Sequence, residues 1–379
     1  MGGERQRRRR LRVMAGTPAE HGFTFPPEWA RHEGTWFSWP RPEGISFPDK
    51  YHPVPAVLAR IFREIAARER VHVNVPNGNY ERIVAEQLRA HGCPLRHVVF
   101  HRIPTNECWC RDHGPAFVLR RDGRGRTQAA IVDWGFNAWG GKYPPWDYDD
   151  AVPTRVAEEY GLPVFYPGIV MEGGAVDVNG AGTVLTTTSC LLNRNRNPGL
   201  PRREVERYLK DYYGQRHVVW LGEGIEGDDT DGHVDDLARF LDPRTIVTAV
   251  EEDPADANYV RLRENRARLA RARDQDGRPF EIVEIPMPRP VLHQGERLPA
   301  TYVNFLFVNG ALLVPTYRDR RHDRRALETL QRVLPDRDVV GIDCTEIIWG
   351  LGAIHCLSQQ QPEFSLTPNA QRRAAGTVR

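Results

Sequence analysis

Short β-rich runs alternate with amphipathic helical patterns along most of the chain, and this alternation restricts the possible folds more than any other sequence feature. The runs are rich in β-branched residues, and they cover residues 71–76, 129–136, 183–192, 217–221, 245–250, 280–285 and 339–342. Alternation of this kind is typical of strand–helix–strand crossovers. We therefore expect an α/β fold.

The segments between these runs give two further local predictions. Leu58, Ile61, Phe62 and Ile65 recur at the spacing of one helical face. Asp253-Pro254 combines an N-cap residue with a first-turn proline, so we expect an Arg-rich helix to begin there and to run to about residue 273. We interpret this helix as a solvated face.

Within residues 303–316, Asn309-Gly310 separates two apolar runs, and this is the strongest short hairpin signal that a sequence can carry. The chain thus combines hairpins with αβ crossovers. About five strand-rich modules, each with a helix, can be distinguished, although no motif repeats at a fixed period.

The domain organisation follows from the absence of long Gly/Ser or Pro linkers. We expect a single catalytic domain at 20–365, because a compact domain rarely contains long unstructured connections. Residues 1–13 hold six Arg and one Glu, and we interpret 1–19 as a basic disordered extension. We expect 366–379 to form a flexible C-terminal tail.

Charge and composition exclude several classes of protein. The formal net charge of +2 becomes −3 without residues 1–13, so nucleic-acid binding by the fold itself is disfavoured. The sequence contains no run of 18 apolar residues, which argues against a membrane span. Six cysteines in 379 residues are too few for a disulfide scaffold, so we expect a cytoplasmic protein.

Two motifs resemble binding loops for cofactors or ions but lack a required part. Gly222, Gly224 and Gly227 match the dinucleotide-binding spacing, yet the acidic run 228–231 follows them where a helix N-terminus should hold pyrophosphate. The same run resembles a calcium loop, but Ala238 stands where a bidentate Glu belongs.

Two other groups have the composition of metal ligands. Cys108, Cys110 and His113 could begin a zinc site, but no second ligand pair follows at a suitable spacing. His233-x-Asp235 could begin an iron triad that a distant histidine such as His355 completes, but that arrangement needs a jelly-roll barrel. We therefore predict no metal and no cofactor.

A more informative group consists of polar residues in unusual contexts. Asp112 lies in a predicted loop before an apolar run, and Glu172 precedes two glycines at a predicted strand start. His233 and Asp235 are two residues apart, so in an extended segment they would face the same side. Cys356 follows His355 in a Gly-rich approach. Each of these has a structural explanation when taken alone: an ion pair, a turn cap, a core histidine or core packing.

Taken together, these residues fit one kind of chemistry. Carboxylates pair bidentately with the planar fork of a guanidinium group, and a cysteine thiolate can attack the central carbon of that group. A histidine can carry the protons. The residues therefore favour a cationic, guanidinium-containing substrate.

The motifs W-x-R-D-x-G-P, E-G-G, H-x-D, A-x-Y-x-N-F and H-C-x-[ST]-Q-Q occur in this order from about residue 109 to 360. In this respect the chain resembles the agmatine deiminase and bacterial-type peptidylarginine deiminase family over about nine-tenths of its length. The resemblance implies the pentein α/β propeller, in which five ββαβ modules surround a pseudo-fivefold axis and the site lies in the central channel.

The resemblance also implies roles for individual residues. Cys356 matches the nucleophile, His233 the general acid/base, and Asp112 with Asp235 the pair that binds the guanidinium. Glu172 matches the acid that orients or charges the histidine. Trp109 and Asn304 match residues that line the pocket.

The sequence departs from the family pattern at Asn106-Glu107-Cys108, at Thr301 and in a short segment at 140–147. The resemblance places these positions around the channel mouth, where the tail of the substrate would lie.

The activity implied is hydrolytic deimination of agmatine to N-carbamoylputrescine and ammonia, without metal or cofactor. Peptidylarginine with a C-terminal Arg, or free arginine, is the alternative substrate, and a non-catalytic guanidine-binding protein is a further alternative. No nucleic-acid or membrane partner is expected, and the sequence leaves a homodimer open.

Overall fold

The computed structural model describes residues 11–365, which form a mixed α/β fold. Five sheets share one plan: two antiparallel strands are followed by a helical connection and then by a strand parallel to the second. In neighbour order, these sheets are β19 (Ser358–Pro362), β2 (His32–Ser38), β3 (Arg70–Asn74) and β4 (Val98–His101); β5 (Ala116–Arg121), β6 (Thr127–Val132), β7 (Pro163–Phe165) and β1 (Arg12–Val13); β8 (Val176–Val178), β9 (Thr183–Thr187) and β10 (His217–Leu221); β11 (Ala238–Phe240), β12 (Thr245–Val250) and β13 (Glu281–Pro286); and β16 (Leu306–Val308), β17 (Ala311–Thr316) and β18 (Asp338–Asp343).

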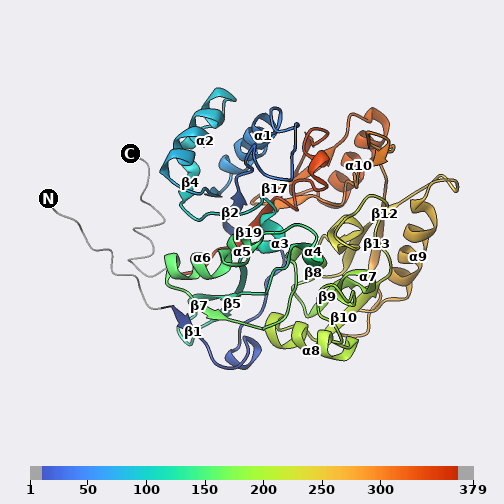
Figure 1. Cartoon of the computed structure of the whole chain (residues 1–379). Helices are drawn as coiled ribbons and strands as arrows, with labels where there is room; N and C mark the ends of the chain where they lie inside the picture. The colour runs from blue at the N-terminus through green and yellow to red at the C-terminus, as the bar shows by residue number, and fades with distance from the viewer. Residues whose placement is uncertain (1–10, 366–379) are drawn as a thin grey trace.

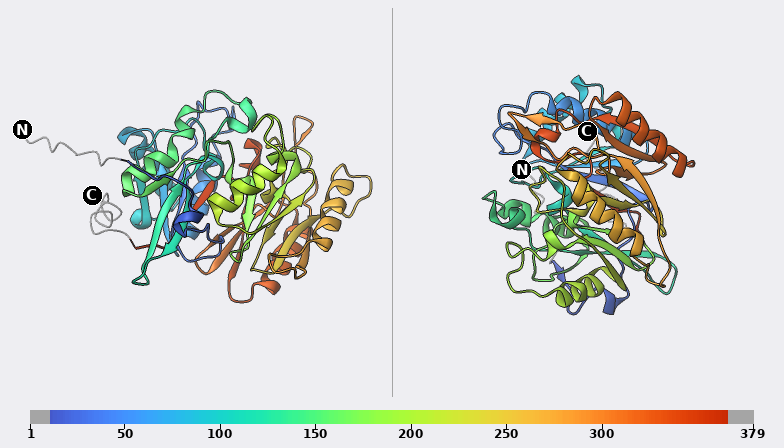
Figure 2. Two further views of the ribbon diagram at one scale, coloured as in Figure 1. Left: turned by 90° about the horizontal axis from the view of Figure 1, so that it is seen from below. Right: turned by 90° about the vertical axis from the view of Figure 1, so that its right-hand side faces the viewer.

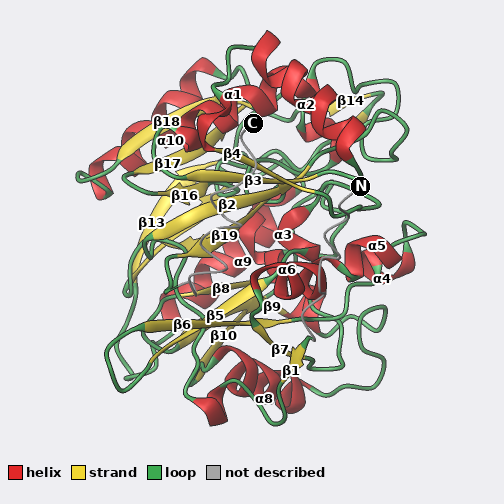
Figure 3. Cartoon of the chain, turned by 90° about the vertical axis from the view of Figure 1, so that its left-hand side faces the viewer, coloured by secondary structure: helices red, strands yellow, loops and turns green. Residues whose placement is uncertain are grey.

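The longer helices lie at the outside of the molecule, and the strands lie between them (Figure 1). Figure 2 shows the same arrangement from two further directions, and Figure 3 distinguishes helices from strands by colour. The helices are α1 (Val54–Ala66), α2 (Gly78–Ala90), α3 (Cys110–His113), α4 (Ala138–Gly141), α5 (Asp147–Asp150), α6 (Val152–Tyr160), α7 (Thr188–Leu191), α8 (Arg202–Tyr213), α9 (Asn258–Arg271) and α10 (Arg320–Val333). Short 3-10 turns occur at η1 (Ala19–His21), η2 (Leu95–His97), η3 (Gly173–Ala175), η4 (Val234–Asp236) and η5 (Ile348–Gly350).

Two of the local predictions are confirmed. The apolar face predicted around Ile61 and Phe62 belongs to α1, and its side chains are buried in the main core. Asn309-Gly310 forms the two-residue turn between β16 and β17, in which Val308 pairs with Ala311 and Gly310 takes a φ of 77°. That left-handed conformation has no steric cost for glycine.

Two boundaries differ from the prediction. The run 183–192 is strand only to Thr187, because the Thr187 side chain accepts a hydrogen bond from the Cys190 N–H and caps α7. The helix predicted from Asp253 begins at Asn258 instead, since the Asp253 carboxylate accepts from the N–H of Ala255 and closes a turn there.

The predicted disordered extension at 1–19 is wrong in its last part. Arg12 and Val13 form β1, which pairs in parallel with β7, and η1 begins at Ala19. Residues 1–10 and the predicted flexible tail at 366–379 lie outside the described residues.

The last described strand, β19, meets the second strand of the chain, β2, in one sheet. β19 runs antiparallel to β2, and the buried Trp36 indole donates a hydrogen bond of 2.8 Å to the Gln361 side chain. The sheet that carries the C-terminal end of the chain is therefore completed by its N-terminal part. Among the described helices, none is both long and apolar enough to cross a membrane.

Candidate active site

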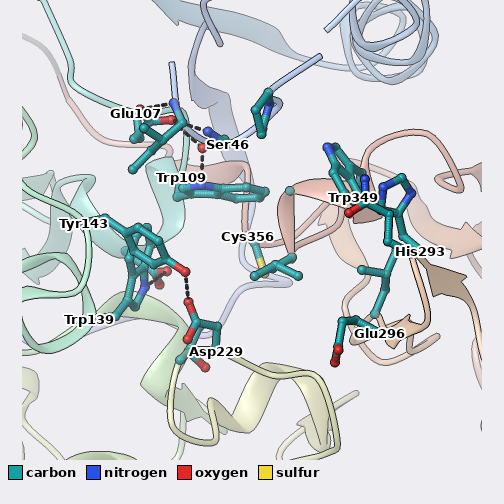
Figure 4. A pocket seen from close by; sticks show the side chains of 18 residues that line it. Ser46, Glu107, Trp109, Trp139, Tyr143, Asp229, His293, Glu296, Trp349 and Cys356 are labelled. Carbon is teal, nitrogen blue, oxygen red and sulfur yellow. Dashed lines mark hydrogen bonds between the residues drawn. The ribbon is translucent and has the colours of Figure 1, made fainter. Parts of the chain in front are cut away.

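A cavity of about 380 Å³ is lined mostly by residues of loops and short helices, and Cys356 is one of them (Figure 4). Trp109 and Asp112 also line this cavity, whereas His233, Asp235, Glu172 and Asn304 are buried and do not line it. The structure thus brings the predicted site residues together in two groups, one at the cavity wall and one behind it.

Cys356 lies two residues before β19, and it is the only cysteine among the described residues that lines the cavity. The Asn304 amide Nδ2 lies 3.0 Å from its Sγ, and Asp235 Oδ2 lies 4.0 Å from it. Burial and the nearby carboxylates of Asp235, Asp236 and Asp112 raise the pKa of the thiol well above its usual range. In the free site, the cysteine is therefore a thiol.

Asp112 lies in the short helix α3 and not in the predicted loop. Its carboxylate accepts hydrogen bonds of 3.0 Å from the Trp139 indole N–H and from the Gly174 backbone N–H. Burial raises the pKa of Asp112 to about 6, and the charges of Asp235 and Glu172 act in the same direction.

His233 is the residue before η4, so the predicted extended segment is not present; a turn of 3-10 helix brings His233 and Asp235 to the same side instead. The His233 ring nitrogens lie 3.7 Å from Asp112 Oδ1 and 3.9 Å from Glu172 Oε2. Burial acts to lower the pKa of His233, but Asp112, the Cys190 thiol and Glu172 raise it well above its usual range. The nearby acidic groups therefore favour the imidazolium form of His233.

Glu172 is held from the opposite side by Arg196. It precedes η3, so a 3-10 turn separates it from β8, where a strand start was predicted. Arg196 Nε donates a hydrogen bond of 2.5 Å to Glu172 Oε1, and both side chains are buried. Burial acts to raise the pKa of Glu172, but His233 and Arg196 lower it. Glu172 therefore stays ionised beside His233.

Asp235 is tied to a second histidine. Its Oδ2 accepts a hydrogen bond of 2.6 Å from His355 Nδ1, and the Asn304 amide lies 3.4 Å away. Burial acts to raise the pKa of Asp235, but the hydrogen bond and charge of His355, with the charges of His233 and Arg239, lower it. Asp235 therefore carries a charge next to the thiol.

Gly174 occupies the point where these groups converge. A Cβ atom added there would lie 2.5 Å from His233 Nδ1, 2.9 Å from Asp112 Oδ1 and 3.1 Å from Asp235 Oδ2. Real Cβ atoms do not approach other atoms so closely, so only glycine fits without displacing these side chains. The sequence analysis noted the two glycines after Glu172, but it did not predict this role.

An aromatic wall separates the thiol from the cavity mouth. The Trp109 indole N–H donates a hydrogen bond of 2.9 Å to Ser46 Oγ. Gly350 and Gly352 have no side chains, so the Trp109 ring can pack closely beside Cys356. Trp139 enters from α4, where Ala138 and Trp139 both take a left-handed backbone conformation. This strained turn aims the indole N–H at Asp112.

The cavity mouth is acidic. Glu107, Asp229 and Glu296 line it, and no Arg or Lys lines the cavity among the described residues. Figure 4 shows Tyr143 and Asp229 on one side and Trp349, His293 and Glu296 on the other. Of the positions where the sequence departs from the family pattern, Glu107 and Tyr143 line the cavity, and the buried Thr301 does not.

Two buried groups in the described residues have the composition of metal ligands. In the first, atoms of Glu172, Cys190 and His233 lie within 4.8 Å of one another; in the second, atoms of Asp235, Asp236 and Cys356 do so. Three of these residues are predicted to act on a guanidinium directly, and Glu172 already pairs with Arg196. We therefore assign no metal to either group.

Comparison with known proteins places the chain in a family. Residues 24–362 match the family described as Porphyromonas-type peptidyl-arginine deiminase. The chain belongs to this family. Agmatine deiminases of Pseudomonas aeruginosa and Pseudomonas putida are each 38% identical to it; the first match covers 91% of this chain and 97% of the relative, and the second covers 93% and 99%.

Solved structures of agmatine deiminases resemble this chain along almost its whole length. An Enterococcus faecalis agmatine deiminase matches with a TM-score of 0.86 and 33% identity, over 93% of this chain and 99% of that one. A C. jejuni agmatine deiminase with substrate bound matches with a TM-score of 0.80 and 29% identity, over 90% and 97%. The resemblance that the sequence motifs indicated is thereby confirmed.

Proposed function

We propose that this member of the peptidyl-arginine deiminase family hydrolyses agmatine to N-carbamoylputrescine and ammonia. The observation that carries the proposal is the cluster around Gly174, in which Asp112, Asp235 and His233 converge beside the thiol of Cys356. Such a cluster offers two anionic acceptors, a proton donor and a nucleophile to one planar cation.

Asp112 and Asp235 bind the guanidinium and place its carbon at Cys356. The bound cation offsets the carboxylate charges that keep Cys356 protonated, so the thiol releases its proton to solvent water once substrate is bound and becomes a thiolate. The Sγ–C bond forms next, and imidazolium His233 protonates the departing nitrogen, which leaves as ammonia.

The second half of the reaction releases the product. The neutral imidazole of His233 takes a proton from water, the resulting hydroxide attacks the amidino-thioether carbon, and the C–S bond breaks to give the ureido product. Glu172 stabilises the imidazolium in both halves, since it stays ionised and lies 3.9 Å from His233 Nε2. Trp109 and Asn304 shape the pocket around the reacting carbon.

The acidic mouth supports agmatine over arginine. Glu107 and Glu296 can face the ammonium tail of agmatine, whereas Asp229 is already paired with Lys142 at 3.3 Å. Because no Arg or Lys lines the cavity among the described residues, the α-carboxylate of arginine would meet carboxylates there without a cation in the cavity wall. We expect kcat/KM for agmatine to exceed that for arginine by at least ~10²-fold.

The measurement is ammonia release from agmatine, free arginine and a peptide that ends in arginine. The family description keeps peptidylarginine as the second candidate. A preference for the peptide, or equal rates on agmatine and arginine, would contradict the agmatine assignment, and binding of agmatine without ammonia release would favour a non-catalytic protein.

We also propose that the five sheets of shared plan are the five modules of a pentein propeller around the site, within one catalytic domain at 20–365. Their common strand order supports this, as does a hydrophobic core that joins residues from Phe37 to Leu357. The sequence left a homodimer open, and sedimentation would distinguish it from a monomer.

A further inference from the structure

His355 lies between two buried carboxylates, and the mechanism above does not use it. Its Nδ1 is 2.6 Å from Asp235 Oδ2, and its Nε2 is 2.7 Å from Glu28 Oε2. The imidazole is 2% exposed. Glu28 belongs to the N-terminal part of the chain, 327 residues away in sequence.

Each nitrogen of this ring faces one carboxylate oxygen. Nδ1 lies at hydrogen-bond distance from Asp235 and Nε2 from Glu28, and a carboxylate oxygen accepts a hydrogen bond from a ring N–H. The ring thereby links the two acids. Arg239 and Arg111 donate to the same Glu28 oxygen at 2.8 Å and 3.4 Å, so Glu28 is anchored from several sides.

The position of this histidine determines which oxygen of Asp235 remains available. Oδ2 is occupied by His355, whereas Oδ1 is buried and has no hydrogen-bond partner among the described residues. A buried carboxylate oxygen without a donor is costly, and a guanidinium N–H would satisfy it.

The main chain at His355 is fixed as well. The backbone N–H of His355 donates a hydrogen bond of 3.1 Å to Asn304 Oδ1, and Arg111 Nε donates one of 3.3 Å to the backbone carbonyl oxygen of His355. The ring therefore has little freedom to turn away from Asp235, and the next residue is the nucleophile.

We infer that His355 is a positioning residue for deimination: its Nδ1–H holds Oδ2 of Asp235, so that the carboxylate stays rotated with Oδ1 available to the substrate guanidinium. This inference rests on the proposed function, because it assigns to Asp235 the task of binding a guanidinium. It adds a residue that touches neither the substrate nor the thiol.

Two amide variants separate the two hydrogen bonds. In His355→Asn, the side-chain amide nitrogen replaces Nδ1 and can still donate to Asp235, whereas in His355→Gln it replaces Nε2 and reaches Glu28 instead. We expect kcat/KM on agmatine to fall by at least ~10²-fold in the Gln variant and by less than ~10-fold in the Asn variant. Rates are expressed per active site, and the active sites are counted by titrating Cys356 with a haloacetamidine. Inactive protein then does not lower the rate.

Combining each His355 variant with Asp235→Asn tests whether the effect of His355 depends on Asp235. With Asp235 neutralised, the difference between the Gln and Asn variants should shrink to less than ~3-fold, since the two sites share one interaction. If the Gln variant does not fold, Glu28→Gln replaces it: this change leaves the His355–Asp235 bond in place and should cost less than ~10-fold in kcat/KM.

Equal losses in the Gln and Asn variants, a difference that persists with Asp235→Asn, or a loss above ~10²-fold in Glu28→Gln would each overturn the inference. These outcomes are measured against wild-type turnover of agmatine. Failure of the wild-type protein to release ammonia would instead contradict the proposed function.

Discussion

At the scale of single residues, Cys356 is distinguished from the other cysteines by access to the cavity and not by burial. All six cysteines are buried, but only Cys356 lines the cavity in the described part of the chain. Cys356→Ser should therefore abolish ammonia release while the unfolding midpoint stays within a few degrees of wild type. A haloacetamidine adduct, located by peptide mass mapping, should lie on Cys356; labelling of Cys108 or Cys110 instead would contradict the assignment.

The two aspartates should differ in their pH dependence. Below about pH 6, Asp112 is protonated and loses the charge that binds the guanidinium, so kcat/KM should fall as the pH decreases through about 6. Asp112→Asn should lower kcat/KM at pH 8 by at least ~10-fold. It should also remove the acid limb, that is, the decrease of kcat/KM toward low pH.

Asp235→Asn should lower kcat/KM at least ~10-fold as well, but it should keep the acid limb. The limb should move to lower pH, because the charge of Asp235 is one of the causes that raise the pKa of Asp112. Identical pH profiles for the two variants would contradict this distinction, which pH-dependent steady-state kinetics can measure.

At the scale of elements, the turn η3 leaves room for the site residues because Gly174, which lies in it, has no side chain. Gly174→Ala would place a methyl group 2.5 Å from His233 Nδ1, so His233 or its neighbours must shift. Since a displacement of about 1 Å can cost ~10² in rate, kcat should fall by at least that factor. Gly123→Ala is the matched control, because its added Cβ would have no atom within 4 Å; equal kinetics for both variants would contradict the role of Gly174.

The sequence allowed the strands with strong β-branched patterns to be predicted, and β10 and β12 have the predicted bounds. It did not reveal where side chains end an element, as Thr187 does by capping α7, because capping depends on local geometry. The short strand β11 was also missed, since three residues carry almost no periodic signal.

The site was predictable only in part. The chemistry of Cys356, His233 and the two aspartates is visible in their residue types and in the family motifs. Their supports are not, because Arg196 reaches Glu172 and Glu28 reaches His355 only in the folded chain. An Arg or Glu taken alone is most often a surface residue, so its sequence context gave no reason to select it.

At the scale of the whole molecule, the pairing of β19 with β2 joins the two ends of the core. Gln361→Ala would leave the buried indole N–H of Trp36 without its acceptor, at a cost of about 1–3 kcal/mol in the free energy of unfolding. Chemical denaturation followed by intrinsic fluorescence can measure this change. Glu86→Ala, on the exposed face of α2, should cost less than ~0.5 kcal/mol, and an equal cost at both positions would contradict the role of this hydrogen bond.

The same pairing has a consequence during protein synthesis. β2 is translated some 320 residues before the strand that completes its sheet, and the nucleophile lies only two positions before that strand. A nascent chain must therefore keep the β19 side of β2 unpaired until β19 leaves the ribosome, and unpaired strand edges invite association with other chains. Catalytic competence would then appear only once β19 has been synthesised and paired, and this enzyme would gain more than most from a chaperone that covers β2 until then.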